Sequence, residues 1–147
     1  MEHKDRKKTE EALSEIYRNA QLALQSISDI LPAVNDSQVK NELLAQHEEY
    51  EKISGRAAAL AKDKGIELKE PNPMKKMMMW GSIKMSTLTN GTRAHIAEMM
   101  IQGTVMGITS LKTTEGKAEC ADEEICELLR ELIALEEKYE KKLKTFL

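Results

Sequence analysis

The sequence predicts an all-α fold, a single antiparallel four-helix bundle over residues 1–147. Aromatic residues make up 3% of the chain, Met occurs nine times, and Glu and Lys dominate a charged fraction of 32%, a composition that favours long helices over strands. Apolar residues recur at three- and four-residue spacing in four segments, as expected for helices that each bury one face. A chain of 147 residues suits one core, so we expect one domain.

The first two segments predict a helical hairpin. An apolar stripe over residues 7–31 marks the first helix, which Pro32 ends because proline cannot continue a helix. A few residues later, Asp36 or Ser37 supplies a side chain suited to cap a second helix, which ends at Gly65. Because this connection is short, the second helix is expected to turn back antiparallel to the first.

The connection between the second and third helices, residues 66–91, is predicted to be a long crossover that contains a short helix. The apolar residues of that helix lie on two faces, and a helix that is apolar on two sides needs two contacts. We expect one face to cover the bundle and the other to form a homodimer contact or to bind another protein. The predicted interface residues are Met74, Met77, Met78, Trp80 and Ile83. Nearby lysines suggest a membrane surface as an alternative, but so short a patch would bind lipid weakly.

The third helix, predicted over residues 92–111 and ending near Gly116, organises the bundle because it is apolar almost all the way round. Such a helix must be covered by neighbours on most sides. Gly103 and Gly107 each cost about 1 kcal/mol of helix propensity relative to Ala. We therefore expect these two glycines to let another backbone come close.

The last helix is predicted to begin at Asp122 and to end near Lys144. Its acidic first turn and its lysine-rich last turns suit the helix dipole. The connections between the four helices are therefore short, long and short. Two antiparallel hairpins joined by one long crossover form the ferritin-like arrangement, whereas cytokine bundles need two long connections.

Packing motifs in the third helix and the crossover carry a resemblance to a known family. They are the runs Ile96-Ala97-Glu98-Met99, Ile101-Gln102-Gly103 and Met106-Gly107-Ile108, together with the Met- and Lys-rich segment 74–85. With these motifs, residues 42–147 resemble a family of small, uncharacterised ferritin-like bundle proteins from Firmicutes. The resemblance implies the fold, and ferritin-like proteins commonly form oligomers. The motifs concern packing and imply no activity.

Ferritin-like bundles can hold two iron or manganese ions, with one Glu from each of two helices and a Glu-x-x-His motif from each of the other two. No predicted helix contains Glu-x-x-His, and the first helix carries no acid within its apolar stripe. A standard di-iron centre is therefore not expected. The candidate ligands for a divergent site are His47, His95, Glu98 and Glu136.

Each candidate ligand also has a purely structural interpretation. Glu136 lies in the middle of the apolar face of the last helix, where an unpaired carboxylate is costly, so it needs a partner. A Tyr hydroxyl, Lys or Arg would serve that need as well as a metal. His47 lies at the margin of the stripe of the second helix and can hydrogen-bond locally. His95 and Glu98 belong to a narrow polar stripe that can face water.

Charge and motif content limit other functions. The net charge of −3, with acids and bases interleaved, argues against nucleic acid as a partner. The charged N-terminus is not followed by an apolar run long enough for a signal peptide or a membrane span, so we expect a cytoplasmic protein. Cys120 and Cys126 match neither a zinc nor a redox spacing and are expected to be idle thiols. No motif for nucleophilic catalysis occurs.

Two functional hypotheses follow from the sequence. The first is a ferritin-like bundle without a complete di-iron site, which acts as an oligomeric structural or protein-interaction module, most simply a homodimer, and not as a catalyst. The second is a divergent metal-binding bundle that holds iron or manganese with the His and Glu candidates. We prefer the first because the set of ligands is incomplete on the first helix.

Overall fold

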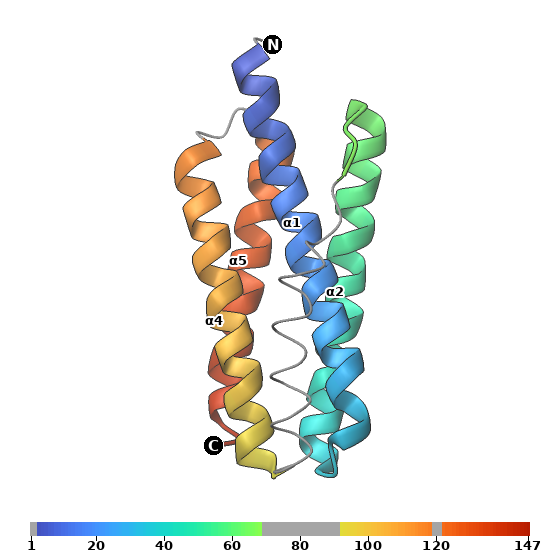
Figure 1. Cartoon of the computed structure of the whole chain (residues 1–147), viewed down its shortest axis with the longest axis vertical. Coiled ribbons are helices and arrows are strands. Elements are labelled where there is room, and N and C mark those ends of the chain that lie inside the picture. Colours follow the sequence, from blue (N-terminus) through green and yellow to red (C-terminus); the bar gives the residue numbers. More distant parts are fainter. Residues whose placement is uncertain (1–2, 69–91, 119–121) are drawn as a thin grey trace.

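The computed structural model describes residues 3–68, 92–118 and 122–147, and every regular element in these ranges is helical (Figure 1). The elements are α1 (His3–Ile30), the short 3₁₀ helix η1 (Leu31–Ala33), α2 (Ser37–Lys64), α4 (Arg93–Ala118) and α5 (Glu123–Lys144). The prediction of an all-α fold is confirmed for these residues. No helix in the described part of the chain combines the length and the apolar character needed to cross a membrane.

Some predictions fall on residues outside those ranges. They are the short helix within the crossover, the thiol of Cys120 and the interface set Met74, Met77, Met78, Trp80 and Ile83. The other cysteine, Cys126, is buried in α5.

Side chains and backbone conformation at the helix ends explain where α2 and α5 begin and where α2 stops. Asp36 Oδ1 accepts hydrogen bonds from two backbone N–H groups in the first turn of α2, at 2.9 and 3.0 Å. Asp122 Oδ1 accepts one at 3.2 Å from the first turn of α5. Gly65 adopts φ 64°, the left-handed conformation that ends α2 and that glycine adopts without strain. These three boundaries agree with the prediction.

Two other boundaries differ from the prediction. α1 begins at His3 rather than near Lys7, and α4 continues past Gly116 to Ala118. The first turns of α1 are charged, with Arg6 and Lys7 exposed, so these turns have no apolar periodicity from which they could be predicted. One glycine in an exposed turn costs about 1 kcal/mol, which is too little to end a long helix.

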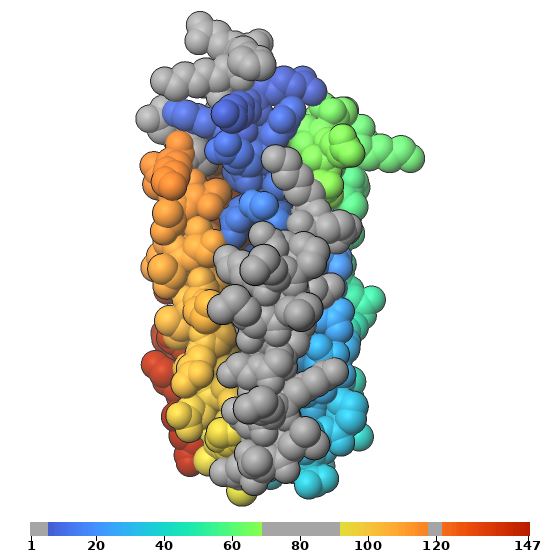
Figure 2. Space-filling view, viewed as in Figure 1, coloured from blue at the N-terminus to red at the C-terminus, as the bar shows by residue number. Residues whose placement is uncertain are grey.

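Neighbouring helices run in opposite directions. In Figure 1 the colours that follow the sequence run in opposite senses along α1 and α2, and along α1 and α4. Contacts agree with this, because a later position on one helix contacts an earlier position on its neighbour. The pairs are Gln21–Ser54 and Ser28–His47 between α1 and α2, Asn19–Gly107 and Glu15–Ser110 between α1 and α4, and Arg56–Glu131 and Lys64–Asp122 between α2 and α5. In the upper part of the face in view, Figure 2 shows α1, in blue, between α4, in orange, and α2, in green.

All four α-helices contribute apolar side chains to one core. The largest fully buried side chains are Leu13, Ile16, Ile27, Ile30, Leu43, Ile96, Leu111, Ile125, Leu128, Leu129, Leu132 and Leu143. Burying a side chain of this size stabilises the fold by about 1.5–3 kcal/mol relative to leaving it exposed. This core fixes the positions of the few polar side chains that are buried with it.

The expectation that neighbours would cover α4 on most sides is wrong. Its buried side chains lie on one face, where they include Ile96, Ala97 and Leu111. Val105 is 40% exposed and Met106 is 56% exposed. α4 therefore has a buried face and an exposed face, although apolar residues occur on both.

The expected role of the two glycines of α4 is also corrected. No atom of the described residues lies within 4 Å of the place where a Cβ on Gly103 would be. A Cβ on Gly107 would lie 2.6 Å from Glu136 Oε2 and 3.0 Å from Asn19 Nδ2. Two polar side chains, rather than another backbone, therefore approach Gly107, and Gly103 makes no close contact within the described structure.

Replacing each glycine by alanine should change the free energy of unfolding differently at the two positions. Gly103→Ala is expected to raise the free energy of unfolding by up to about 1 kcal/mol, because Ala gains helix propensity without a clash. Gly107→Ala should be less favourable than Gly103→Ala by about 0.5–1 kcal/mol, because the flexible ends of the Glu136 and Asn19 side chains must shift to other rotamers. Urea unfolding followed by circular dichroism measures both values. Equal effects of the two substitutions would contradict the close contact at Gly107.

Candidate functional site

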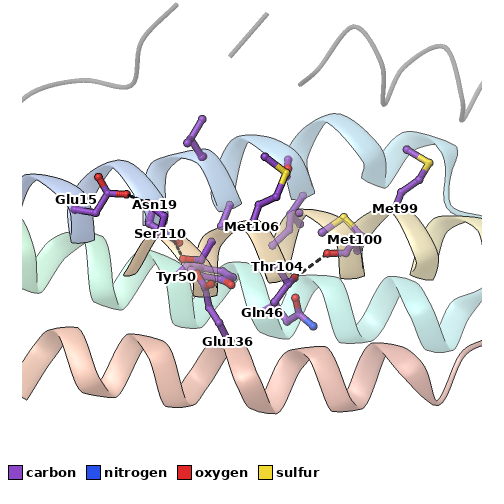
Figure 3. Close-up of a pocket in the computed structure, with 16 residues that line it drawn as sticks. Glu15, Asn19, Gln46, Tyr50, Met99, Met100, Thr104, Met106, Ser110 and Glu136 are labelled. Atoms are coloured by element: carbon purple, nitrogen blue, oxygen red, sulfur yellow. Dashed lines mark hydrogen bonds between the residues drawn. The ribbon is translucent and has the colours of Figure 1, made fainter. Parts of the chain in front are cut away.

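A pocket of about 110 Å³ lies between α1, α2 and α4, and Glu136 of α5 contributes to its lining (Figure 3). Apolar side chains form much of the wall, and they come from α1 and α4. These residues are Leu22, Ala23, Ile27, Met99, Met100 and Met106. The polar lining includes residues from each of the four helices, so the pocket depends on the packing of the whole bundle.

Glu136 is the most deeply buried ionisable group in the lining, with 1% of its surface exposed. Burial raises the pKa of its carboxyl group to about 8, while a hydrogen bond with the Tyr50 hydroxyl acts in the opposite direction. Glu136 Oε2 has no hydrogen-bond partner among the described residues. Figure 3 shows Glu136 rising from α5 toward Tyr50.

Tyr50 of α2 connects Glu136 to the aromatic part of the core. Its ring centroid lies 5.7 Å from that of Tyr139, at an interplanar angle of 56°. Burial, followed by the nearby Glu136 carboxylate, raises the pKa of Tyr50 well above its usual value. The Tyr50 hydroxyl therefore stays protonated and is available as a hydrogen-bond donor to Glu136.

Two buried amide side chains also belong to the polar part of the lining. Asn19 Nδ2 donates a hydrogen bond to the backbone oxygen of Gly107 at 3.3 Å. Gln46 Nε2 donates one to Glu42 Oε2 at 2.9 Å. Each amide thus uses one of its two N–H groups, so each side chain keeps one N–H donor as well as its oxygen acceptor.

The four candidate metal ligands lie in different surroundings. His47 Nδ1 pairs with Glu51 Oε1 at 2.8 Å, and its Nε2 lies 3.4 Å from the Ser28 hydroxyl, so it hydrogen-bonds locally on α2 and to α1.

His95 lies in the first turn of α4, where its Nε2 has no partner among the described residues, and Glu98 is exposed. Glu136 is buried and interacts with a tyrosine, one of the partners that the sequence suggested. Within residues 3–68, 92–118 and 122–147, no group of three or more His, Cys, Asp or Glu side chains could hold a metal ion. The four candidates therefore do not converge on one site.

Sequence analysis identified Glu136 but missed the polar residues around it. Asn19 and Gln46 are 8% and 1% exposed, respectively. The available signal was their position: Asn19 lies beside Ala20 in the apolar stripe of α1, and Gln46 lies four residues before Tyr50 in that of α2. Polar side chains inside an apolar stripe indicate a buried polar site.

Comparison with known proteins adds no relative. No protein-family model matches the chain, and neither a curated protein nor a solved structure matches it. The functional argument therefore rests on the geometry of the chain itself.

The raised pKa of Glu136 predicts a characteristic dependence of stability on pH. Its value of about 8 in the folded protein exceeds the ordinary value of 4.5, so the folded state binds the proton more tightly. The contribution of Glu136 to the free energy of unfolding should therefore fall as pH rises from about 4.5 to about 8, by up to about 1.4 kcal/mol per pH unit, and then level off. Glu136→Gln, which stays neutral, should lose this fall.

The measurement is the difference in unfolding free energy between Glu136→Gln and wild type across this pH range, from urea titrations. Glu137→Gln on the same helix is the matched control, because Glu137 is exposed and forms only a surface ion pair with Lys112. The Glu136→Gln variant should gain stability relative to wild type as pH rises, and the control should not. A constant difference for Glu136→Gln would show that Glu136 is ionised throughout.

Proposed function

We propose that this protein is a non-catalytic, ligand-binding helical bundle with ferritin-like connectivity, and that its ligand is a small organic molecule held in the pocket beside Glu136. The observation that carries the proposal is a buried carboxyl oxygen without a partner in the wall of a pocket. A buried polar atom that makes no hydrogen bond costs about 1–3 kcal/mol. A ligand that bonds to Oε2 would remove this cost on binding.

The order of the helices supports the ferritin-like part of the proposal. α1 and α2 are joined through η1 and three further residues, α4 and α5 through a similarly short connection, and α2 and α4 through the long segment 65–92. Bundles of this kind build their sites between facing helices from inward-pointing side chains. Here the described interior offers Glu136, Tyr50 and two amides in place of a set of carboxylate ligands.

The composition of the wall supports a small amphipathic ligand. Pockets for small molecules are mostly apolar, with a few polar groups that fix orientation. Three methionines line this pocket, and their flexible side chains can adapt to ligands of different shapes.

A blocked pocket should lose binding. When n-pentylamine or 1-pentanol is titrated into the protein, at least one should shift the methyl NMR signals of Met99, Met100 and Met106 more than those of the other methionines. Ala23→Leu should weaken this response at least about tenfold, because the larger side chain enters a pocket of about 110 Å³. Ala58→Leu, at an exposed position of α2, is the matched control and should bind as wild type does. Failure of both probes to shift the pocket methionines would refute the proposed function.

A second candidate function, an oligomeric interaction module, is favoured by one observation. Val105 and Met106 are adjacent, apolar and exposed on α4, at 40% and 56%. Exposed apolar side chains that are adjacent rather than scattered can mark a contact surface. We therefore propose that a second copy of the chain covers this part of α4. The originally expected interface residues lie outside the described structure.

Val105→Glu should shift the molecule from dimer to monomer, because a charge at the centre of an apolar contact must be desolvated without a partner. Light scattering coupled to size-exclusion chromatography measures the mass directly. Leu44→Glu is the control, since Leu44 is also exposed, at 47%, but lies on α2. A wild-type protein that is monomeric at high concentration rules out this second function and leaves ligand binding untouched.

A further inference from the structure

We infer that the ligand of this pocket is a primary alkylamine, bound as its ammonium cation, with an N–H group donated to Oε2 of Glu136. This inference rests on the proposed ligand-binding function and identifies the chemical class of the ligand. Three features of the described lining support it: the sign of its charges, the unpartnered oxygen of Glu136, and its apolar wall.

The ionisable side chains of the lining favour a cation. The described lining contains two carboxyl groups, those of Glu15 and Glu136, and no Lys, Arg or His. Glu15 is already engaged, because it pairs with Arg18 at 2.9 Å and accepts a hydrogen bond from Ser110. Glu136 is therefore the acid that a bound cation can neutralise.

The hydrogen-bonding state of the lining favours a donor. Asn19 and Gln46 each donate one amide N–H, to the Gly107 backbone oxygen and to Glu42 respectively. Thr104 Oγ1 donates to the backbone oxygen of Met100 at 2.8 Å. Glu136 Oε2 accepts no hydrogen bond from the described residues. Once ionised, Glu136 thus presents an unused acceptor, and an ammonium group carries three N–H donors and no acceptor. An anionic ligand would instead face the two carboxyl groups of the described lining without a described cation to offset its charge.

Pocket size and wall composition favour a short alkyl chain. An apolar cavity of about 150 Å³ can hold benzene, with its six non-hydrogen atoms, so by proportion a pocket of about 110 Å³ holds about four or five, and about six is its upper limit. The apolar wall, which includes Leu22, Ile27 and Met100, suits a saturated chain. The ammonium end of such a ligand then lies at Glu136.

Binding of the cation should release a proton from Glu136. The carboxyl group has a pKa of about 8 in the free protein, so it is mostly neutral at pH 7 and must ionise to pair with the ammonium group. The ionisable group that faces it from α2 is Tyr50, and Tyr139 stacks near Tyr50 from α5. α1 and α4 place the neutral Asn19 side chain and the backbone of Gly107 against it. No described cation therefore competes with the ligand for this carboxylate.

The test compares n-pentylamine with 1-pentanol, which has the same chain and no charge. Both are titrated into the full-length protein at constant ionic strength, and the methyl signals of Met99, Met100 and Met106 report binding at the pocket. At about pH 8 the amine should bind at least about tenfold more tightly than the alcohol. Between about pH 6 and pH 8 its dissociation constant should fall by up to about tenfold per pH unit, because deprotonation of Glu136 is coupled to binding, whereas that of the alcohol should stay constant.

Glu136→Gln should remove both the preference for the amine and its pH dependence while keeping the affinity for 1-pentanol. Glu137→Gln should leave all three unchanged. Where Glu136→Gln does not fold, calorimetry on the wild type in two buffers of different ionisation enthalpy gives the second measurement. It should find between about half and one proton released per amine bound at pH 7. Absence of proton release would contradict the inference.

The other outcomes are distinct. Equal affinity for amine and alcohol would contradict the inference that the ligand is a cation, but would leave the ligand-binding function standing. No binding of either would refute that function as well. A lysine side chain carries the same ammonium group, so Nα-acetyl-lysine N-methylamide is titrated in parallel. Tighter binding of this lysine derivative than of n-pentylamine would contradict the inference that the ligand is a free alkylamine, and would indicate a lysine side chain of a peptide instead.

Discussion

The interior of this bundle is arranged around one buried carboxyl group, that of Glu136. A carboxyl group that is 1% exposed must be either neutral or partnered, because an isolated charge in an apolar interior is very costly. The fold meets this constraint from three sides. α2 supplies the Tyr50 hydroxyl, α4 supplies a glycine that leaves room for Oε2, and α1 supplies the Asn19 amide beside that glycine. The same contacts leave Oε2 without a partner among the described residues. The carboxyl group that is costly to bury is therefore also the centre of the candidate site.

Much of the fold was predictable because its determinants are local. The Asp36 cap, the stop at Gly65 and the Asp122 cap depend on backbone groups only a few residues away, so their residue types reveal them in the sequence. The deep burial of Glu136 was equally visible, because a single acid interrupts a regular apolar stripe. A Tyr hydroxyl was one of the partners that the pattern suggested, and Tyr50 is the one found.

The rest could not be predicted because it depends on how the helices rotate and slide against each other. Periodicity shows that Gly107 and Glu136 belong to helices that pack together, but not that they face each other. It likewise gives no reason to separate Gly107 from Gly103, which lies one turn away and has no close neighbour among the described residues. His47 illustrates the same limit: it lies at the edge of the predicted stripe, yet α2 is rotated so that its ring contacts Glu51 and Ser28 rather than the interior.

A purely structural role for Glu136 explains the observed contacts less completely than a binding role does. Replacing buried ionic groups by well-packed apolar ones of similar volume is often neutral or stabilising, so stability alone gives no reason to keep an acid at this position. Fold specificity could favour one, but a polar group that fixes helix register normally has its hydrogen bonds satisfied within the fold. Glu136 instead has one oxygen engaged by Tyr50 at most, and the other lies in the wall of a pocket without a described partner. An acid in that state can lose its proton when a cationic donor binds beside it. This coupling between ligand binding and deprotonation is useful in a binding site and has no use in a core that binds nothing.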